Sequence, residues 1–143
     1  MISEQYYAVL NSLDNGQPFT NLVAYAISSD FKFLLFATNK RAEKYTRIKK
    51  NANVSLLIDN RTNQPEDVSC AVAITVFGTA AEETINRHLK SLFIDRHPRL
   101  KEFIGQPTTA LIQVRIVDYV IAHFDRTHHF LPEELRTITF VEE

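Results

Sequence analysis

The sequence predicts a mainly β domain, built as a closed antiparallel barrel of five or six strands with a few helices. Two observations predict this fold. Most apolar residues lie in short runs, rich in β-branched and aromatic side chains, that polar turn formers separate. These runs are arranged as hairpins, and closing the sheet removes its exposed strand edges. No internal repeat or linker divides the 143 residues, so we expect one domain over residues 1–143.

The expected elements follow in chain order. A first helix is predicted from Ser3, a favourable cap, to the turn at residues 14–16. Its apolar residues have helical spacing and are Tyr6, Tyr7, Val9, Leu10 and Leu13. Strands are expected at Phe19–Ile27, Phe31–Ala37, Val54–Asp59, Val68–Phe77 and Thr108–Ala122. Tyr25, Phe33, Phe36 and Phe77 are the expected aromatic core.

Three helices are expected between the strands. The first covers Lys40–Lys50, with Thr38 and Asn39 as N-cap candidates. Thr84 is the candidate cap of the second, and Pro98 fits the first turn of a third, short helix. Gly78 predicts a bulge or a tight bend between the strand that ends at Phe77 and residues 79–82. The last twenty residues show mixed character, and only residues 138–141 favour a short strand there.

Composition excludes several classes of function. The net charge of −1 gives no global attraction to nucleic acid. A lone cysteine, Cys70, excludes an internal disulfide, and its apolar neighbours predict a buried position. The amino terminus lacks a signal-peptide pattern, and no apolar run has membrane-spanning length, so we expect a cytoplasmic protein.

Other catalytic and metal-binding patterns are weak. The five histidines lack zinc-like spacing, and His128 and His129 are adjacent, so their side chains diverge. We therefore expect no metal site. With three glycines the chain has no phosphate-binding loop or dinucleotide fingerprint, and no nucleophile motif is present. The adjacent glutamates at 82–83 and 133–134 are more typical of solvated surface than of a catalytic pair.

The most informative stretch runs from residue 34 to residue 50. An apolar strand ends at Thr38, and the helix that follows begins with Lys40, Arg41 and Lys44. Cations are unfavourable at the positive end of a helix dipole, whereas a bound anion would make them favourable. A solvated basic helix explains the same residues equally well. If the helix begins at Lys40, Lys40 and Lys44 share a face.

The order of these features resembles the pyridoxamine 5'-phosphate oxidase-like FMN-binding split barrels. A strand is followed by Thr38, by Lys44 six residues later in a helix, and then by Asn51-Ala52-Asn53-Val54 and another apolar strand. The likeness extends from about Leu22 to Glu83. It implies a six-stranded antiparallel split barrel with Greek-key connections, in which Thr38 and Lys44 hold the phosphate of FMN. Ala42 and Glu43 stand where this family often has Ser and Arg.

The resemblance also implies a homodimer with FMN at the subunit interface. We expect Asn39 and Arg41, with the backbone N–H groups of the helix, to assist Thr38 and Lys44. The implied activity is electron transfer between FMN and a reduced nicotinamide or small organic substrate. The substrate stays open, because the chain has no tryptophan and its end, residues 130–136, does not match the substrate motifs of pyridoxamine-phosphate oxidases. The alternatives are a flavin-binding or electron-transfer module without its own substrate, and a split barrel that binds F420 or haem.

Overall fold

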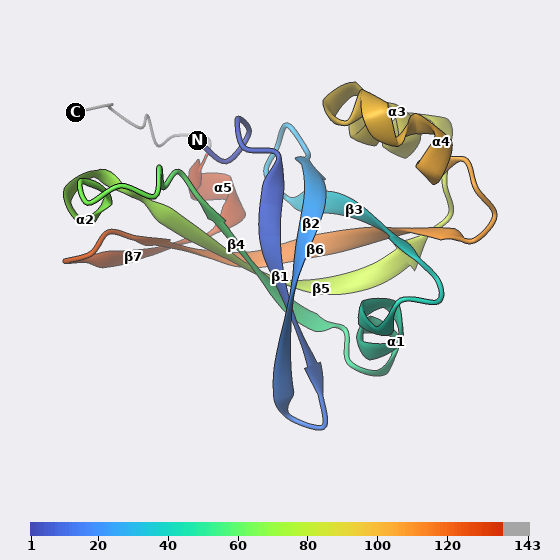
Figure 1. Ribbon diagram of the computed structural model, residues 1–143, viewed down its shortest axis with the longest axis horizontal. Coiled ribbons are helices and arrows are strands. Elements are labelled where there is room, and N and C mark those ends of the chain that lie inside the picture. Colours follow the sequence, from blue (N-terminus) through green and yellow to red (C-terminus); the bar gives the residue numbers. More distant parts are fainter. Residues whose placement is uncertain (136–143) are drawn as a thin grey trace.

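The structure, a computed structural model, describes residues 1–135 of the chain. Its seven strands form one antiparallel sheet in the order β3-β2-β1-β4-β5-β6-β7. Pairing of β3 with β6 closes the first six strands into a barrel, which confirms the predicted six-stranded antiparallel barrel (Figure 1). Strand β4 returns to lie beside β1 after the β1-β2-β3 meander, which is a Greek-key arrangement.

The strands are β1 (Tyr7–Asp14), β2 (Gln17–Ile27), β3 (Phe33–Asn39), β4 (Asn53–Asp59), β5 (Ala73–Glu83), β6 (Thr109–Ala122) and β7 (Thr127–Phe130). The α-helices are α1 (Glu43–Lys50), α2 (Asp67–Cys70), α3 (Arg87–Arg96), α4 (Lys101–Ile104) and α5 (Pro132–Leu135), with a 3-10 turn at Pro98–Leu100. The strands predicted in β2, β3, β4 and β6, and the helices predicted in α1, in α3 and at Pro98, are therefore confirmed, with shifted ends.

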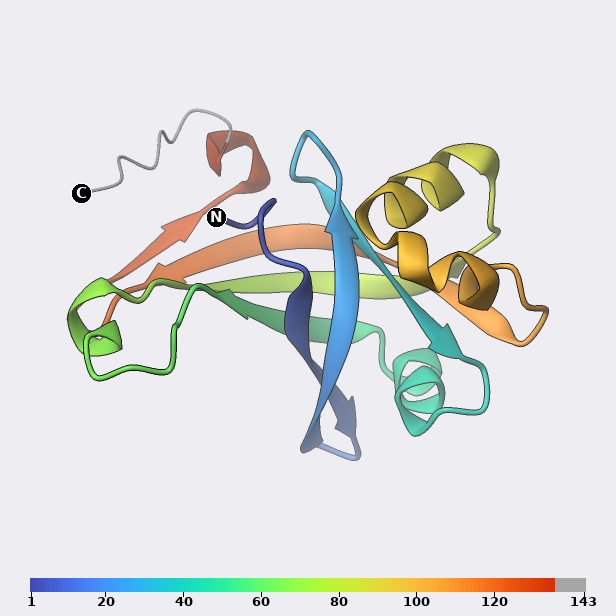
Figure 2. The ribbon, with the colours of Figure 1, turned by 45° about the horizontal axis from the view of Figure 1, so that its top comes forward.

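Alternation along the strands separates two apolar clusters. In β3, Leu34 and Phe36 point into the barrel, where they pack with Leu10, Val76 and Ile112. The intervening Leu35 faces outward, against α3 and α4 on the outside of the barrel (Figure 2). The same alternation corrects one core prediction, because Phe77 points outward between Val76 and Gly78 and is 43% exposed.

The predicted first helix is wrong, because residues 7–14 form strand β1. Helical spacing and strand alternation both fit this apolar segment, and pairing with β2 decides between them. Asn15 (φ 49°) and Gly16 (φ 79°) form the two-residue turn between Asp14 and Gln17. Positive φ at both central positions is what a tight hairpin turn needs, and Asn-Gly supplies it.

The strand predicted to begin at Val68 instead begins at Ala73, because α2 forms before it. The Asp67 carboxylate, at the first residue of α2, accepts backbone N–H bonds from Thr62, Asn63 and Gln64. These bonds hold the pKa of Asp67 below its usual value, and they stabilise the turn that leads into the helix. Cys70 lies on α2 and is exposed, so the prediction of a buried cysteine is wrong.

The remaining differences concern the cap of α3 and two elements that the sequence did not predict. The cap of α3 is Asn86, whose side chain accepts the Leu89 N–H at 2.9 Å, and not Thr84. The sequence pattern did not reveal β7, which pairs with the end of β6, or α5. The strand predicted at residues 138–141 lies outside the described residues. Within residues 1–135, no helix has the length and apolar character that crossing a membrane requires.

The predicted bulge at Gly78 is confirmed by a register shift between Phe77 and Gly78 against β6. A Cβ at this position would lie 2.5 Å from the Arg115 carbonyl oxygen and 2.6 Å from Val114 Cγ1.

We expect Gly78→Ala to lower the free energy of unfolding by about 1–3 kcal/mol, because the Arg115 backbone and the Val114 side chain must both shift. Urea denaturation measures this. Gly105→Ala is the control, since its Cβ would meet nothing closer than 3.5 Å; an equal loss in both variants would contradict the account.

Candidate functional site

The four predicted site residues lie together at the connection from β3 to α1. Thr38 and Asn39 end β3, Arg41 lies in the turn, and Lys44 is the second residue of α1. Pairing of Thr38 with Ala110 of β6 fixes the end of β3. Figures 1 and 2 show α1 at one end of the barrel, immediately after this strand. The structure therefore brings the predicted residues into one short segment.

Thr38 faces the barrel interior and is 2% exposed. Its hydroxyl makes one long contact, 3.4 Å from Oγ1 to the carbonyl oxygen of the neighbouring Asn39. A hydroxyl hydrogen bond to an oxygen is normally 2.7–2.8 Å, so this contact leaves the donor weakly used.

Asn39 shapes the turn before α1. Its side-chain Oδ1 accepts the Arg41 N–H at 2.8 Å, and its carbonyl accepts the Ala42 N–H at 3.0 Å. The Lys40 N–H is bound to the Thr108 carbonyl at 2.9 Å. The backbone N–H groups of residues 40–42 are thus occupied within the protein. The prediction that Asn39 caps the helix is wrong, because its side chain closes the turn one step earlier.

Helix α1 begins at Glu43, with Ala42 as an N-cap residue that forms no side-chain hydrogen bond. The predicted Thr38 cap is therefore also wrong, and Lys40 lies outside the helix, so it does not share a helix face with Lys44. The N–H groups of Glu43 and Lys44 have no acceptor among residues 1–135. Uncapped N–H groups at the positive end of a helix favour an anion.

The cations around this helix end differ in their partners. Lys40 Nζ lies 3.7 Å from a Glu82 carboxylate oxygen, and Lys49 Nζ lies 2.9 Å from the other. By contrast, Arg41 and Lys44 form no ion pair within the described part of the chain. Lys44 is half-buried and precedes the buried Ile48 by four residues, which places both on one face. Residues 41–44 therefore carry two cations without an ion pair and two free N–H groups, a set of groups suited to a phosphate.

Arg47, near the other end of α1, is buried and only 7% exposed. Its Nε donates to Ser12 Oγ, and its Nη2 donates to Asn21 Oδ1, each at 2.9 Å. This contact was not predicted, because the predicted helix at residues 3–13 hid the inward-facing polar positions of β1. The signal is the strand alternation of residues 7–14, which places Ser12 on the same face as Leu10.

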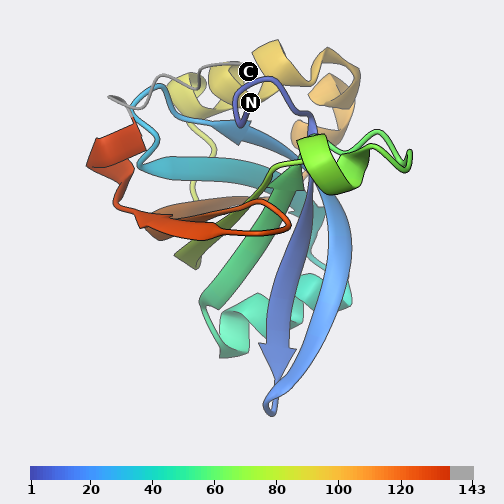
Figure 3. The same cartoon turned by 90° about the vertical axis from the view of Figure 1, so that its left-hand side faces the viewer.

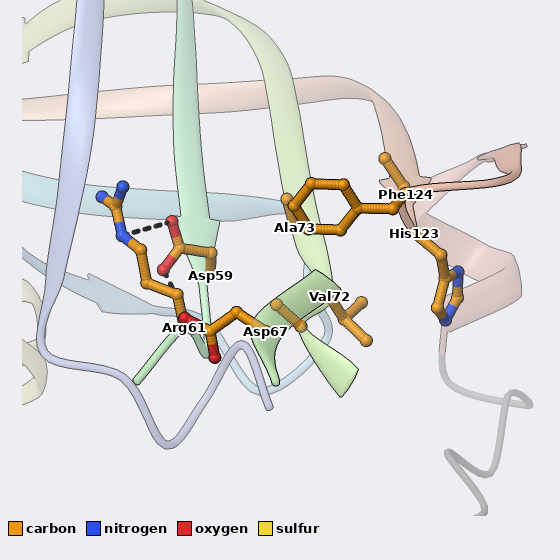
Figure 4. A pocket seen from close by; sticks show the side chains of 9 residues that line it. Asp59, Arg61, Asp67, Val72, Ala73, His123 and Phe124 are labelled. Atoms are coloured by element: carbon orange, nitrogen blue, oxygen red, sulfur yellow. Dashed lines mark hydrogen bonds and ion pairs between the residues drawn. The ribbon is translucent and has the colours of Figure 1, made fainter. Parts of the chain in front are cut away.

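Cavities flank the barrel at different places. A cavity of about 230 Å³ lies beside α1 and is lined by Tyr45, Lys49 and Glu82 over an apolar wall. A cavity of about 320 Å³ lies between α2 and the end of β6, away from α1 (Figure 4). Figure 4 shows the Phe124 ring over its apolar wall and Arg61, whose Nε lies 3.2 Å from an Asp59 carboxylate oxygen. Neither cavity contains the four predicted site residues.

The histidines do not gather into a site. His97 is buried, with Nε2 2.7 Å from the Tyr25 carbonyl oxygen. His128 and His129 lie exposed on β7, and His129 Nδ1 is 3.6 Å from an Asp118 carboxylate oxygen. Across residues 1–135, no three His, Cys, Asp or Glu side chains are close enough together to hold a metal ion.

Comparison with known proteins identifies the family. A family model described as pyridoxamine 5'-phosphate oxidase matches residues 1–120. No curated protein sequence matches the chain.

Solved structures share the fold at low sequence identity. A heme binding protein from Mycobacterium smegmatis superposes with a TM-score of 0.80 at 14% identity, over 92% of this chain and 55% of that chain. General Stress Protein 26 from Bacillus anthracis superposes with a TM-score of 0.68 at 23% identity, over 89% of each chain. A FAD-binding protein from Mesorhizobium loti superposes with a TM-score of 0.63 at 15% identity, over 84% of this chain and 85% of that chain. This chain therefore spans about half the length of the M. smegmatis protein.

The Glu82 carboxylate ties α1 to β5, and its protonation should weaken that attachment. The Tyr45 hydroxyl, which donates to it at 2.6 Å, and Lys49 hold the pKa of Glu82 below its usual 4.5. A carboxylate with a lowered pKa stabilises the fold above the unfolded-state value, and this contribution is lost as pH falls through the folded-state value. We expect Glu82→Gln to cost about 0.5–1 kcal/mol of unfolding free energy at pH 7, as for a partly exposed pair.

The difference between wild type and Glu82→Gln should shrink as pH falls below 4.5, the usual value for this carboxyl. Denaturant titrations at several pH values measure it. Glu83→Gln is the matched control, since Glu83 has no ion pair among the described residues. A difference that stays constant down to pH 2 would contradict this role for Glu82.

Proposed function

Because this chain belongs to the pyridoxamine 5'-phosphate oxidase family, we propose that it binds FMN and acts as an oxidoreductase. The observation that carries the proposal is the uncapped start of α1, where residues 41–44 carry the free N–H groups of Glu43 and Lys44 and two cations, Arg41 and Lys44, without an ion pair among the described residues. These groups fit a phosphate monoester, the charged end of FMN.

The roles of the site residues follow from their contacts. Lys44 and Arg41 would supply positive charge to the phosphate, and the weakly used Thr38 hydroxyl would donate to it. Asn39 would act indirectly, by holding the turn that presents Arg41. Arg41 would also replace the cation that the family often carries at the place of Glu43. FMN itself supplies two-electron redox chemistry, and the protein orients it and selects what reaches it.

A homodimer is part of this proposal. The outer face of the barrel carries an uncharged row across β1, β2, β4 and β5, and in-register pairs connect its members. These residues are Val9, Leu22, Ser55, Leu57, Thr75 and Phe77. Leu22 is 71% exposed and Phe77 is 43% exposed. A partly apolar row without charged members is typical of the centre of an interface, and a two-fold axis would pair it with itself.

The electron donor and the substrate remain open, so the alternative is a flavin-binding or electron-transfer module without its own substrate. Reduction of the bound flavin by NADH or NADPH at catalytic rates would distinguish an enzyme from such a module. F420 and haem are the alternative cofactors on this scaffold. The name of the M. smegmatis structure concerns haem, but at 14% identity that likeness extends only to the fold.

The visible spectrum of the purified protein tests the cofactor. We expect the two absorption bands of a flavin, either directly or after addition of FMN. A Soret band would indicate haem, and a single deazaflavin band would indicate F420. Protein that stays colourless after FMN addition and gel filtration would overturn the proposal.

Light scattering on the same sample tests the dimer, which requires twice the chain mass of 16.4 kDa.

Lys44→Ala tests the phosphate site directly. One charge-assisted hydrogen bond contributes about 1.5–3 kcal/mol, so we expect FMN affinity to fall at least about tenfold. Flavin fluorescence titration measures the affinity. Lys50→Ala is the matched control, because Lys50 is an exposed lysine at the other end of the same helix. Lys40→Ala should have a smaller effect than Lys44→Ala, since Lys40 pairs with Glu82. Unchanged affinity in Lys44→Ala would exclude Lys44 from the site.

A further inference from the structure

Arg47 is the buried cation of α1, and its side-chain hydrogen bonds lead to the β1–β2 hairpin, away from the anion site. Besides its bonds to Ser12 and Asn21, its guanidinium carbon lies 4.5 Å from the centroid of the Phe19 ring. A buried arginine needs acceptors for its N–H groups, because an unpaired charge in this environment is costly. Here the hairpin formed by β1 and β2 supplies those acceptors.

The part of the hairpin that Arg47 contacts has little other support. Strand β1 pairs with β4 only over Val9–Asn11, so residues 12–19 extend beyond the barrel. Figures 1 and 3 show this extension beside α1 at the same end of the molecule. Ser12 pairs with Phe19, and both lie on the face that continues the barrel interior. Arg47 therefore joins a projecting hairpin to the helix.

The same side chain also reaches back toward the anion site. Arg47 Nη1 lies 3.6 Å from a carboxylate oxygen of Glu43, the first residue of α1. Glu43 immediately precedes Lys44, and the helix start has no side-chain cap to hold it otherwise. The placement of Lys44 thus depends on how firmly α1 is held one turn later. Ile48, packed in the core, and Arg47 are the two buried residues that hold it.

We infer that Arg47 is a positioning residue for the phosphate site: by binding Ser12 and Asn21, it holds α1, and Lys44 with it, against the β1–β2 hairpin. This inference rests on the proposed binding of FMN. It also means that hairpin residues contribute to cofactor affinity without touching the cofactor, because the helix transmits their contacts.

The test compares affinities for FMN and for riboflavin, which has the same ring but no phosphate. We expect Arg47→Met to weaken FMN binding by about three- to tenfold, a typical size for such indirect coupling, while riboflavin affinity stays unchanged. Asn21→Ala should do the same to a smaller extent. The double variant should bind FMN no more weakly than Arg47→Met alone, because both substitutions break the same bond.

Arg96→Met is the matched control. Arg96 is also an anchoring arginine, donating to the carbonyls of Glu4 and Gln5, but it lies on α3 and has no contact with α1. Its loss should lower the melting temperature without changing the ratio of FMN to riboflavin affinity. If Arg47→Met does not fold, Arg47→Lys and Asn21→Ala carry the comparison, and both should lower the ratio.

The outcomes separate the two proposals. Wild-type protein that binds FMN no more tightly than riboflavin would overturn the phosphate site, and this inference with it. A preference for FMN that is equal in wild type, Arg47→Met and Asn21→Ala would overturn only the role of Arg47. Equal weakening of both ligands, or additive losses in the double variant, would also overturn it, because each would indicate general destabilisation.

Discussion

The pairing of β3 with β6 is the constraint on which the rest of the molecule depends. It closes the barrel, and it continues to the last residue of β3, where Asn39 pairs with Thr109. Because β6 holds that strand end through Asn39, the direction in which the chain leaves it is fixed, and the Lys40 N–H is bound to the Thr108 carbonyl. This closure therefore fixes where α1 begins. It also fixes the groups at the start of α1 that could bind an anion.

The helix end has an unusual combination of local features. Ala42, at the N-cap position, has no polar side chain with which to cap the helix. Asn39, which precedes the turn, accepts the Arg41 N–H with its side-chain oxygen. The nearby acids are used elsewhere, since Glu43 faces Arg47 and Glu82 holds Tyr45, Lys49 and Lys40. The N–H groups of Glu43 and Lys44 therefore have no acceptor among the described residues, and the cations Arg41 and Lys44 have no ion-pair partner there. An uncapped helix start with such groups is suited to binding an anion.

Much of the fold could be predicted from sequence, because alternating apolar residues and turn formers mark β2, β3, β4 and β6 directly. The segment at residues 7–14 could not, since its apolar spacing suits a helix as well as a strand, and only the long-range pairing with β2 and β4 decides. The strand–helix order placed the four predicted site residues at the end of β3 and the start of α1. Their individual contacts could not be predicted, because hydrogen bonds such as that from the Arg41 N–H to Asn39 depend on a turn geometry that spacing cannot specify. Arg47 shows the same limit, since its partners lie 26 and 35 residues away in the chain.

The position of Cys70 has a practical consequence. It is the only cysteine of the chain, and its thiol is exposed on α2, on the far side of the barrel from α1 (Figure 1). A maleimide dye would therefore attach at one defined point, and the natural sequence already contains a unique labelling handle. Fluorescence from that dye would report on tumbling and self-association without any engineered substitution near the helix.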